Sequence, residues 1–109
     1  MKNILRIPEN IGEEIKKDIK YYAPRETIMF LLAKRIKCSF ATLYLAKTLL
    51  TLDETESFRS SVRAAPSEKF LKFLYSWIKK DNLFSKDYRV VVIHSHPFSS
   101  HDVRMSGID

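Results

Sequence analysis

Residues 89–93, Arg89-Val90-Val91-Val92-Ile93, are the most strongly strand-forming stretch of the chain. β-Branched side chains follow Arg89 without a polar break, and such a run is typical of a strand that is buried on both faces of its sheet. The run leads directly into His94-Ser95-His96-Pro97. Because alternate residues of a strand point to the same side, His94 and His96 project together and could supply two nitrogen ligands to one zinc ion. The same pair is also compatible with two loop histidines that bond to the backbone.

The rest of the chain predicts two helices and further strands around this one. Asn10 and Glu13 fit a capping box at the start of an amphipathic helix. Pro66 and Ser67 should open a second helix, with an apolar stripe made of Phe70, Phe73, Leu74, Trp77 and Ile78. We expect an α/β or α+β fold in which helices flank a mixed β-sheet. In chain order the expected elements of this single domain, 1–109, are helix 10–23, strands 27–36 and 40–52 joined by a hairpin near 37–39, a polar loop over 53–61, a short strand over 61–64, helix 67–80, strand 89–94 and a metal-motif loop over 94–109.

Composition excludes several classes of protein. The 109 residues include 2 Gly, 4 Pro and 1 Cys, which excludes collagen-like and low-complexity chains and any disulfide framework. Cys38, the single cysteine, is expected to be an inert buried residue. The longest uncharged stretch, 38–46, is far shorter than the roughly 20 apolar residues of a membrane span, and a signal-peptide apolar region is not apparent. We therefore expect a cytoplasmic protein without a membrane segment.

The charge balance permits one further class. The chain carries 19 Lys and Arg against 13 Asp and Glu, a formal net charge of +6. Such a chain could present a basic nucleic-acid-binding surface. Acidic residues are mixed through the same segments, however, and this pattern favours ordinary solvated faces over a nucleic-acid partner.

A second motif follows the histidines. In Ser106-Gly107-Ile108-Asp109 the serine and the aspartate are three residues apart, which on the first turn of a helix would put them on one face. The same four residues could also be a plain helix start, with Ser106 as its cap. Together with the histidines, Asp109 would complete three zinc ligands and leave a fourth position open, as catalytic zinc sites do. His101 and Asp102 are alternative ligands in place of Asp109.

The joint pattern closely resembles the H-x-H-P…S-x-x-D signature of the JAMM metalloproteases, also called JAB or MPN domains. That family carries a further glutamate before a buried strand, and Glu26 precedes the apolar run 28–33 in the same way. The order of helices and strands also resembles the family's, so the likeness spans essentially the whole chain. The resemblance implies the cytidine-deaminase-like sandwich of MPN domains, and the small, lysine-rich chain is most similar to prokaryotic members.

The resemblance also implies a set of roles. His94, His96 and Asp109 would bind one zinc ion per chain. Glu26 would hold the zinc-bound water and act as general base, and Ser106 would hydrogen-bond the oxyanion of the tetrahedral intermediate. The implied activity is that of a zinc-dependent isopeptidase or peptidase, acting at the C-terminal tail of ubiquitin or a ubiquitin-like protein.

Two other functions remain open at this point. Family members continue beyond the position of Asp109, so we expect this chain to be a fragment of a longer protein. An incomplete chain of this fold could be a non-catalytic scaffold, or an inactive fragment, that binds protein partners. The sequence also departs from the family pattern at one point, because Ile28-Met29 stands where the family has a pair of glycines. A basic nucleic-acid-binding module is the remaining alternative.

Overall fold

A computed structural model describes the backbone of residues 2–95 and 103–108 and the side chains of residues 2–95. Five strands form one mixed sheet in the order β1-β3-β2-β6-β7, and β4 and β5 form a separate hairpin. Strand β1 is parallel to β3, and the other neighbours are antiparallel. In chain order the elements are β1 Lys2–Arg6, α1 Glu9–Tyr22, β2 Ile28–Lys37, β3 Ala41–Thr51, β4 Ser57–Arg59, β5 Ala64–Pro66, α2 Glu68–Lys80, β6 Tyr88–Ser95 and β7 Val103–Ile108.

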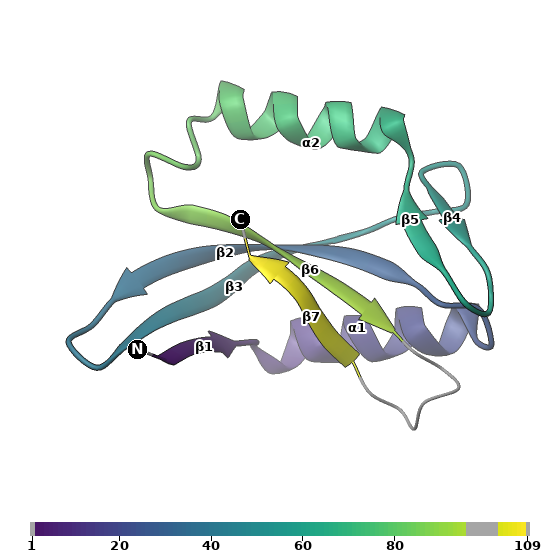
Figure 1. Cartoon of the computed structure of the whole chain (residues 1–109), viewed down its shortest axis with the longest axis horizontal. Helices are drawn as coiled ribbons and strands as arrows, with labels where there is room; N and C mark the ends of the chain where they lie inside the picture. Colours follow the sequence, from purple (N-terminus) through teal and green to yellow (C-terminus); the bar gives the residue numbers. More distant parts are fainter. Residues whose placement is uncertain (1, 96–102, 109) are drawn as a thin grey trace.

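Helices α1 and α2 lie on opposite faces of this sheet (Figure 1). Side chains alternate along β2, so Ile28, Phe30 and Leu32 pack with α2, whereas Met29 and Leu31 pack with α1. A strand covered on both faces needs apolar residues at consecutive positions, and this explains the unbroken apolar runs in β2 and β6. The expected class, a mixed sheet flanked by helices, is therefore confirmed.

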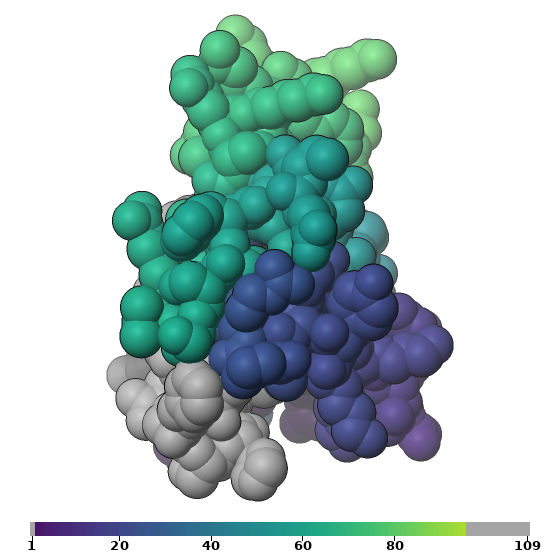
Figure 2. Space-filling view, turned by 90° about the vertical axis from the view of Figure 1, so that its right-hand side faces the viewer, coloured from purple at the N-terminus to yellow at the C-terminus, as the bar shows by residue number. Residues whose placement is uncertain are grey.

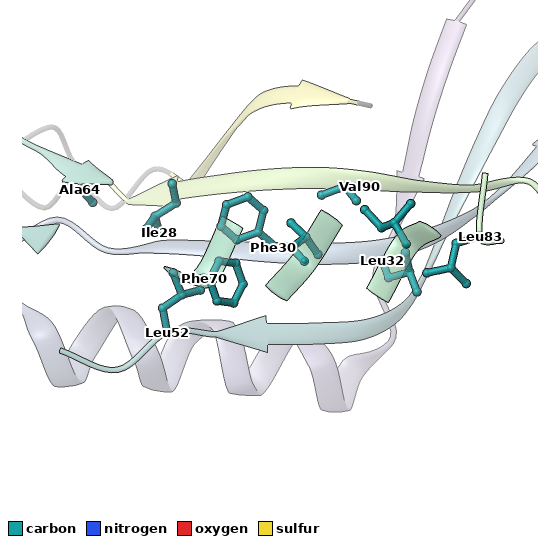
Figure 3. Packing of buried hydrophobic residues seen from close by; sticks show 10 residues of the cluster. Ile28, Phe30, Leu32, Leu52, Ala64, Phe70, Leu83 and Val90 are labelled. Carbon is teal, nitrogen blue, oxygen red and sulfur yellow. The ribbon is translucent and has the colours of Figure 1, made fainter. Parts of the chain in front are cut away.

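The α2 side of the core is built on helical spacing. Phe70, Leu74 and Ile78 are each less than 10% exposed and face the sheet, and the rings of Phe70 and Phe30 are 5.2 Å apart (Figure 3). The hydroxyl of Ser67 accepts a hydrogen bond from the Phe70 amide at 3.1 Å, which confirms the predicted start of this helix. The prediction that Phe73 is a core residue is wrong, since its side chain is largely exposed.

Helix α1 forms where it was expected but begins differently. Ile11 and Ile15 are buried against the sheet, as their spacing predicts. The prediction of a capping box at Asn10 and Glu13 is wrong. The helix begins one residue earlier, after Pro8, and no side chain caps it. The carbonyl of Pro8 accepts the first helical hydrogen bond, and the restricted φ of proline suits a residue that leads into a helix.

The short elements differ most from the sequence prediction. Strand β1 was not predicted at all, and it owes its conformation to parallel pairing with β3, which is distant in sequence. Strand β4 lies inside the predicted loop 53–61, and the second strand of its hairpin begins only at Ala64. Cys38 lies in the turn between β2 and β3 and is half-buried, so its predicted burial is also wrong.

The segment after the histidines contains a strand instead of the predicted loop and helix start. Strand β7 pairs antiparallel with β6 over Val103–Ile108. Without it, β6 would expose a row of unpaired backbone N–H and C=O groups at the sheet edge, and pairing with β7 satisfies them. In the part of the chain that the structure describes, neither helix is long and apolar enough to cross a membrane.

The packing of α2 gives a direct prediction for stability. We expect Leu74→Ala to lower the free energy of unfolding by about 2–5 kcal/mol, because it leaves a cavity between the helix and the sheet. The neighbouring Tyr75 is 65% exposed, so Tyr75→Ala should change it by only about 0.5 kcal/mol. Urea denaturation of both variants measures the difference, and equal losses would contradict the assigned orientation of the helix.

Candidate functional site

The pairing of β2 with β6 brings two predicted site residues to one edge of the sheet. Ile28 lies directly opposite His94 in this pair, and Glu26 precedes Ile28 by two residues. Glu26 lies just before β2, and continued pairing would put it diagonal to His94, a relation in which paired strand residues are about 7–8 Å apart. Because opposite residues of a strand pair share a face, His94 lies on the same face of the sheet as Ile28. The pairing thus brings the segment that contains Glu26 to the end of β6 that carries His94, from positions far apart in sequence.

Glu26 is also unusually enclosed for a glutamate. Its side chain and backbone together are only 7% exposed, although Glu is rarely buried in proteins. Its backbone N–H donates to the carbonyl of Ser60 at 2.6 Å, so the loop of the β4–β5 hairpin lies against it. Figure 2 shows this hairpin, in teal, packed beside the indigo segment that links α1 to β2. His94, on the neighbouring strand, is half-buried.

Thr27 and Ser95 join the two strands at the level of these residues. The Thr27 amide donates to the Ser95 hydroxyl oxygen at 2.8 Å, and the Ser95 amide donates to the Thr27 carbonyl at 3.1 Å. Both residues are at most 1% exposed. Thr27 directly follows Glu26, and Ser95 directly follows His94. The bonded pair therefore lies between the two candidate site residues.

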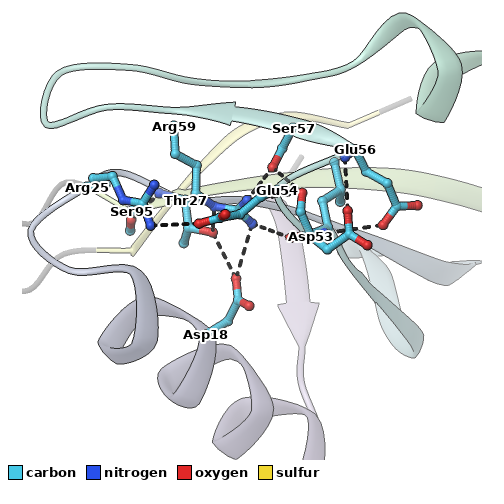
Figure 4. Close-up of polar contacts among 10 residues, drawn as sticks. Asp18, Arg25, Thr27, Asp53, Glu54, Glu56, Ser57, Arg59 and Ser95 are labelled. Carbon is cyan, nitrogen blue, oxygen red and sulfur yellow. Dashed lines mark hydrogen bonds and ion pairs between the residues drawn. The ribbon is translucent and has the colours of Figure 1, made fainter.

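Thr27 is in turn bonded to a buried ion pair. Its hydroxyl donates to Asp18 Oδ2 at 2.8 Å and accepts from Arg59 Nε at 3.0 Å (Figure 4). Arg59 and Asp18 approach to 4.0 Å, with side chains that are only 1% and 13% exposed. We refer to Asp18, Thr27, Arg59 and Ser95 as the polar network. It joins α1, the residue before β2, the strand β4 and the end of β6.

Arg59 is held by more than its charge partner. Its guanidinium group lies over the ring of Tyr22 at 3.6 Å. It also donates to the carbonyl of Leu52, to the Ser57 hydroxyl and, at 3.4 Å, to the carbonyl of Asp53. These bonds use the donors of a fully buried cation, which is the condition for burying one at tolerable cost.

Sequence reasoning missed the polar network. Arg59 lies in a stretch predicted as a loop, and it is enclosed by residues distant in sequence, among them Asp18 and Tyr22 of α1. Asp18 could have been found, because Ile11, Ile15, Asp18 and Tyr22 follow one another at helical spacing and so share one face of α1. A charged residue within a buried stripe indicates a buried partner.

Burial raises the pKa of the Asp18 carboxyl above its ordinary value of 3.8. The hydrogen bond from Thr27 and the charge of Arg59 partly offset this shift, and the charge of Glu14 adds to it. Because the folded-state pKa lies above the unfolded value, the folded protein binds a proton more tightly at this group. The resulting stabilisation is complete below the unfolded pKa and is lost as pH rises through the folded pKa.

This shift predicts a measurable pH dependence. We expect the free energy of unfolding of the parent chain, relative to Asp18→Asn, to increase as pH falls from neutrality to below 3.8. Asp87→Asn is a control of opposite sign, because a hydrogen bond from Arg35 lowers the pKa of Asp87. Relative to that variant, the parent should lose stability as pH falls. Urea titrations at several pH values test both, and a parallel pH profile for the two differences would contradict the assignment.

The remaining predicted site residues are only partly described. His96, His101, Asp102 and Asp109 lie outside the described residues. Of Ser106, the structure describes the backbone, which lies on β7 between Met105, opposite Ile93, and Gly107, opposite Val92. The residue opposite His94 is Arg104, two positions earlier, and Ile108 is opposite Val91. As described, β7 therefore runs away from the end of β6 that carries His94. Within the residues whose side chains are described, no group of three or more His, Cys, Asp or Glu could hold a metal ion.

Several of the basic residues have acidic partners. Lys16 and Glu13, Lys72 and Glu68, Arg25 and Glu54, and Arg35 and Asp87 form ion pairs at 2.8–3.8 Å. Such mixed-sign surfaces are typical of solvated faces, and a groove that follows a nucleic-acid backbone carries an excess of positive charge. The paired charges favour the interpretation as solvated faces.

Comparison with protein-family models, with curated proteins and with solved structures finds no match for this chain. The resemblance to JAMM proteases therefore depends on the residues of the motif and on their placement in the fold.

Proposed function

We propose that this chain carries the zinc centre of a JAMM-type isopeptidase or peptidase. The observation that supports the proposal most strongly is the β2–β6 register, which brings a buried glutamate beside the first histidine of the motif. A carboxylate close to a bound metal ion can serve as the general base in metal-assisted hydrolysis. The proposal includes the MPN form of the α+β fold and a cytoplasmic location.

The donor set fits zinc by its chemistry. His94, His96 and Asp109 would hold one ion with two imidazole nitrogens and a carboxylate oxygen, which leaves a coordination position open. When bound, zinc supplies a Lewis acid that polarises the scissile carbonyl and brings the pKa of a coordinated water to about 7. A metal ligand needs a restrained backbone, and His94 has one because it lies at the end of a buried, paired strand.

Glu26 would act as the general base. Its carboxylate would accept a proton from the attacking water and then deliver it to the leaving amine. The enclosure of Glu26 by the β4–β5 hairpin and by β6 limits its contact with bulk water, and this strengthens its electrostatic interaction with charges in the site. The hydroxyl of Ser106 would donate a hydrogen bond to the oxyanion that develops on the substrate carbonyl.

The position of β7 sets a condition for the complete site. Asp109 directly follows Ile108, which pairs with Val91, three residues before His94. For Asp109 to bind the same ion as His94, the end of β7 would have to leave this pairing.

Zinc binding should therefore increase hydrogen exchange at the amides of β6 that bond to the end of β7, which two-dimensional NMR can follow.

The proposed substrate is a ubiquitin-like protein whose C-terminal tail is joined to a lysine or to a further peptide. A JAMM-type scaffold that binds such a partner without cleaving it is the second candidate. The pairing of Ile108 with Val91 favours this scaffold, because Asp109 would not reach the ion bound by His94 in a chain whose β7 stays paired.

Zinc content and turnover of matched variants test the proposal. We expect close to one zinc per chain after dialysis, measured by elemental analysis. Glu26→Gln should keep the metal and lose about 10²–10⁴-fold of the turnover of a fluorogenic ubiquitin-like conjugate, because only the proton acceptor is removed. His94→Ala should lose both, whereas Tyr75→Ala, at an exposed position of α2, serves as the control and should retain both.

Three outcomes would contradict the proposal or part of it. Absence of zinc from the parent chain would refute the metal site. Equal zinc loss in Glu26→Gln and His94→Ala would make Glu26 a ligand instead of the base. Zinc binding without turnover of any ubiquitin-like conjugate would favour the scaffold.

A further inference from the structure

The polar network lies at the point where the candidate site is assembled. Glu26 and Thr27 lie just before β2, His94 lies near the end of β6, and strand ends fray unless other contacts hold them. The bonded pair of Thr27 and Ser95 joins the two segments directly beside Glu26 and His94. This pair therefore restrains the separation of Glu26 and His94.

The network supports the pair from the opposite face of the sheet. The Thr27 hydroxyl reaches Asp18 of α1, whereas His94, opposite Ile28, belongs to the α2 face. Thr27 can take only a narrow range of orientations, since its single hydroxyl donates to Asp18 and accepts from Arg59 at the same time. Arg59 is itself bonded to the carbonyls of Leu52 and Asp53, directly after β3. Each member thus limits the movement of the next.

From this geometry we infer that Asp18, Thr27, Arg59 and Ser95 are positioning residues, which set the separation between Glu26 and His94 without touching metal or substrate. For its metal readout this inference rests on the proposed zinc site. Outer partners of this kind orient metal ligands in many proteins, and their loss commonly weakens metal binding about 10–100-fold.

Thr27→Val is the sharpest test. Valine keeps the shape of threonine and the backbone bonds to Ser95 but removes the hydroxyl, which leaves Asp18 and the Arg59 Nε group without that partner. We expect zinc affinity, measured by competition with a chromophoric chelator, to fall about 10–100-fold. Thr27→Ser restores the hydroxyl and should recover most of the affinity. Ser95→Ala, which removes the acceptor of the Thr27 amide from the other strand, should weaken binding in the same way.

A control separates positioning from general loss of stability. Ile78→Val shortens a buried side chain of α2, at a position with no part in the polar network. Even where Ile78→Val lowers the unfolding midpoint as much as Thr27→Val does, it should bind zinc like the parent chain. If Thr27→Val and Ile78→Val lose zinc affinity equally, or if neither does, the inference is overturned.

A second readout does not need zinc. In Thr27→Val, hydrogen exchange at the Ser95 and His94 amides should become faster than the change in global unfolding explains, and in Ile78→Val it should follow global unfolding. If the parent binds no zinc, the proposed function fails while this measurement still decides the positioning role. Exchange that follows global unfolding in both variants would overturn the inference.

Discussion

The antiparallel pairing of β2 with β6 is the constraint on which the other features depend. Both strands are apolar at consecutive positions and are covered by a helix on each face, so a slip of one residue would exchange the rows that meet α1 and α2. Each row packs against its own helix, and because protein interiors are close-packed, such an exchange would be costly. The same register bonds Thr27 to Ser95, the residues that directly follow Glu26 and His94.

A buried ionic group at the end of this pair has an energetic cost that the surrounding contacts must offset. Asp18 and Arg59 lose most of their hydration, and the raised pKa of Asp18 reflects that loss. Hydrogen bonds to Thr27 and to backbone carbonyls, with the ring of Tyr22, compensate for it. Hydrophobic side chains could fill the same space with no such cost, but they would not fix the direction of neighbouring groups. The network therefore contributes orientation at the strand ends more than stability.

The sequence predicted the elements whose signals are local. Helices over 9–22 and 68–80 and the central strands follow from periodicity and from apolar runs within a dozen residues. The errors lie where a distant partner decides the conformation. Strand β1 forms on β3, the residues around Ser106 extend along β6 instead of starting a helix, and Arg59 is buried against Tyr22 and Asp18 of α1.

The sequence by itself determined the class of fold and the order of the central elements, because side-chain type and local spacing carry that information. Only the tertiary structure decided which segments meet. A strand register brings the segment before β2, with Glu26, to the end of β6, and β7 pairs with the otherwise open edge of β6. Register and edge pairing depend on contacts between segments far apart along the chain, whose free energy no local pattern expresses.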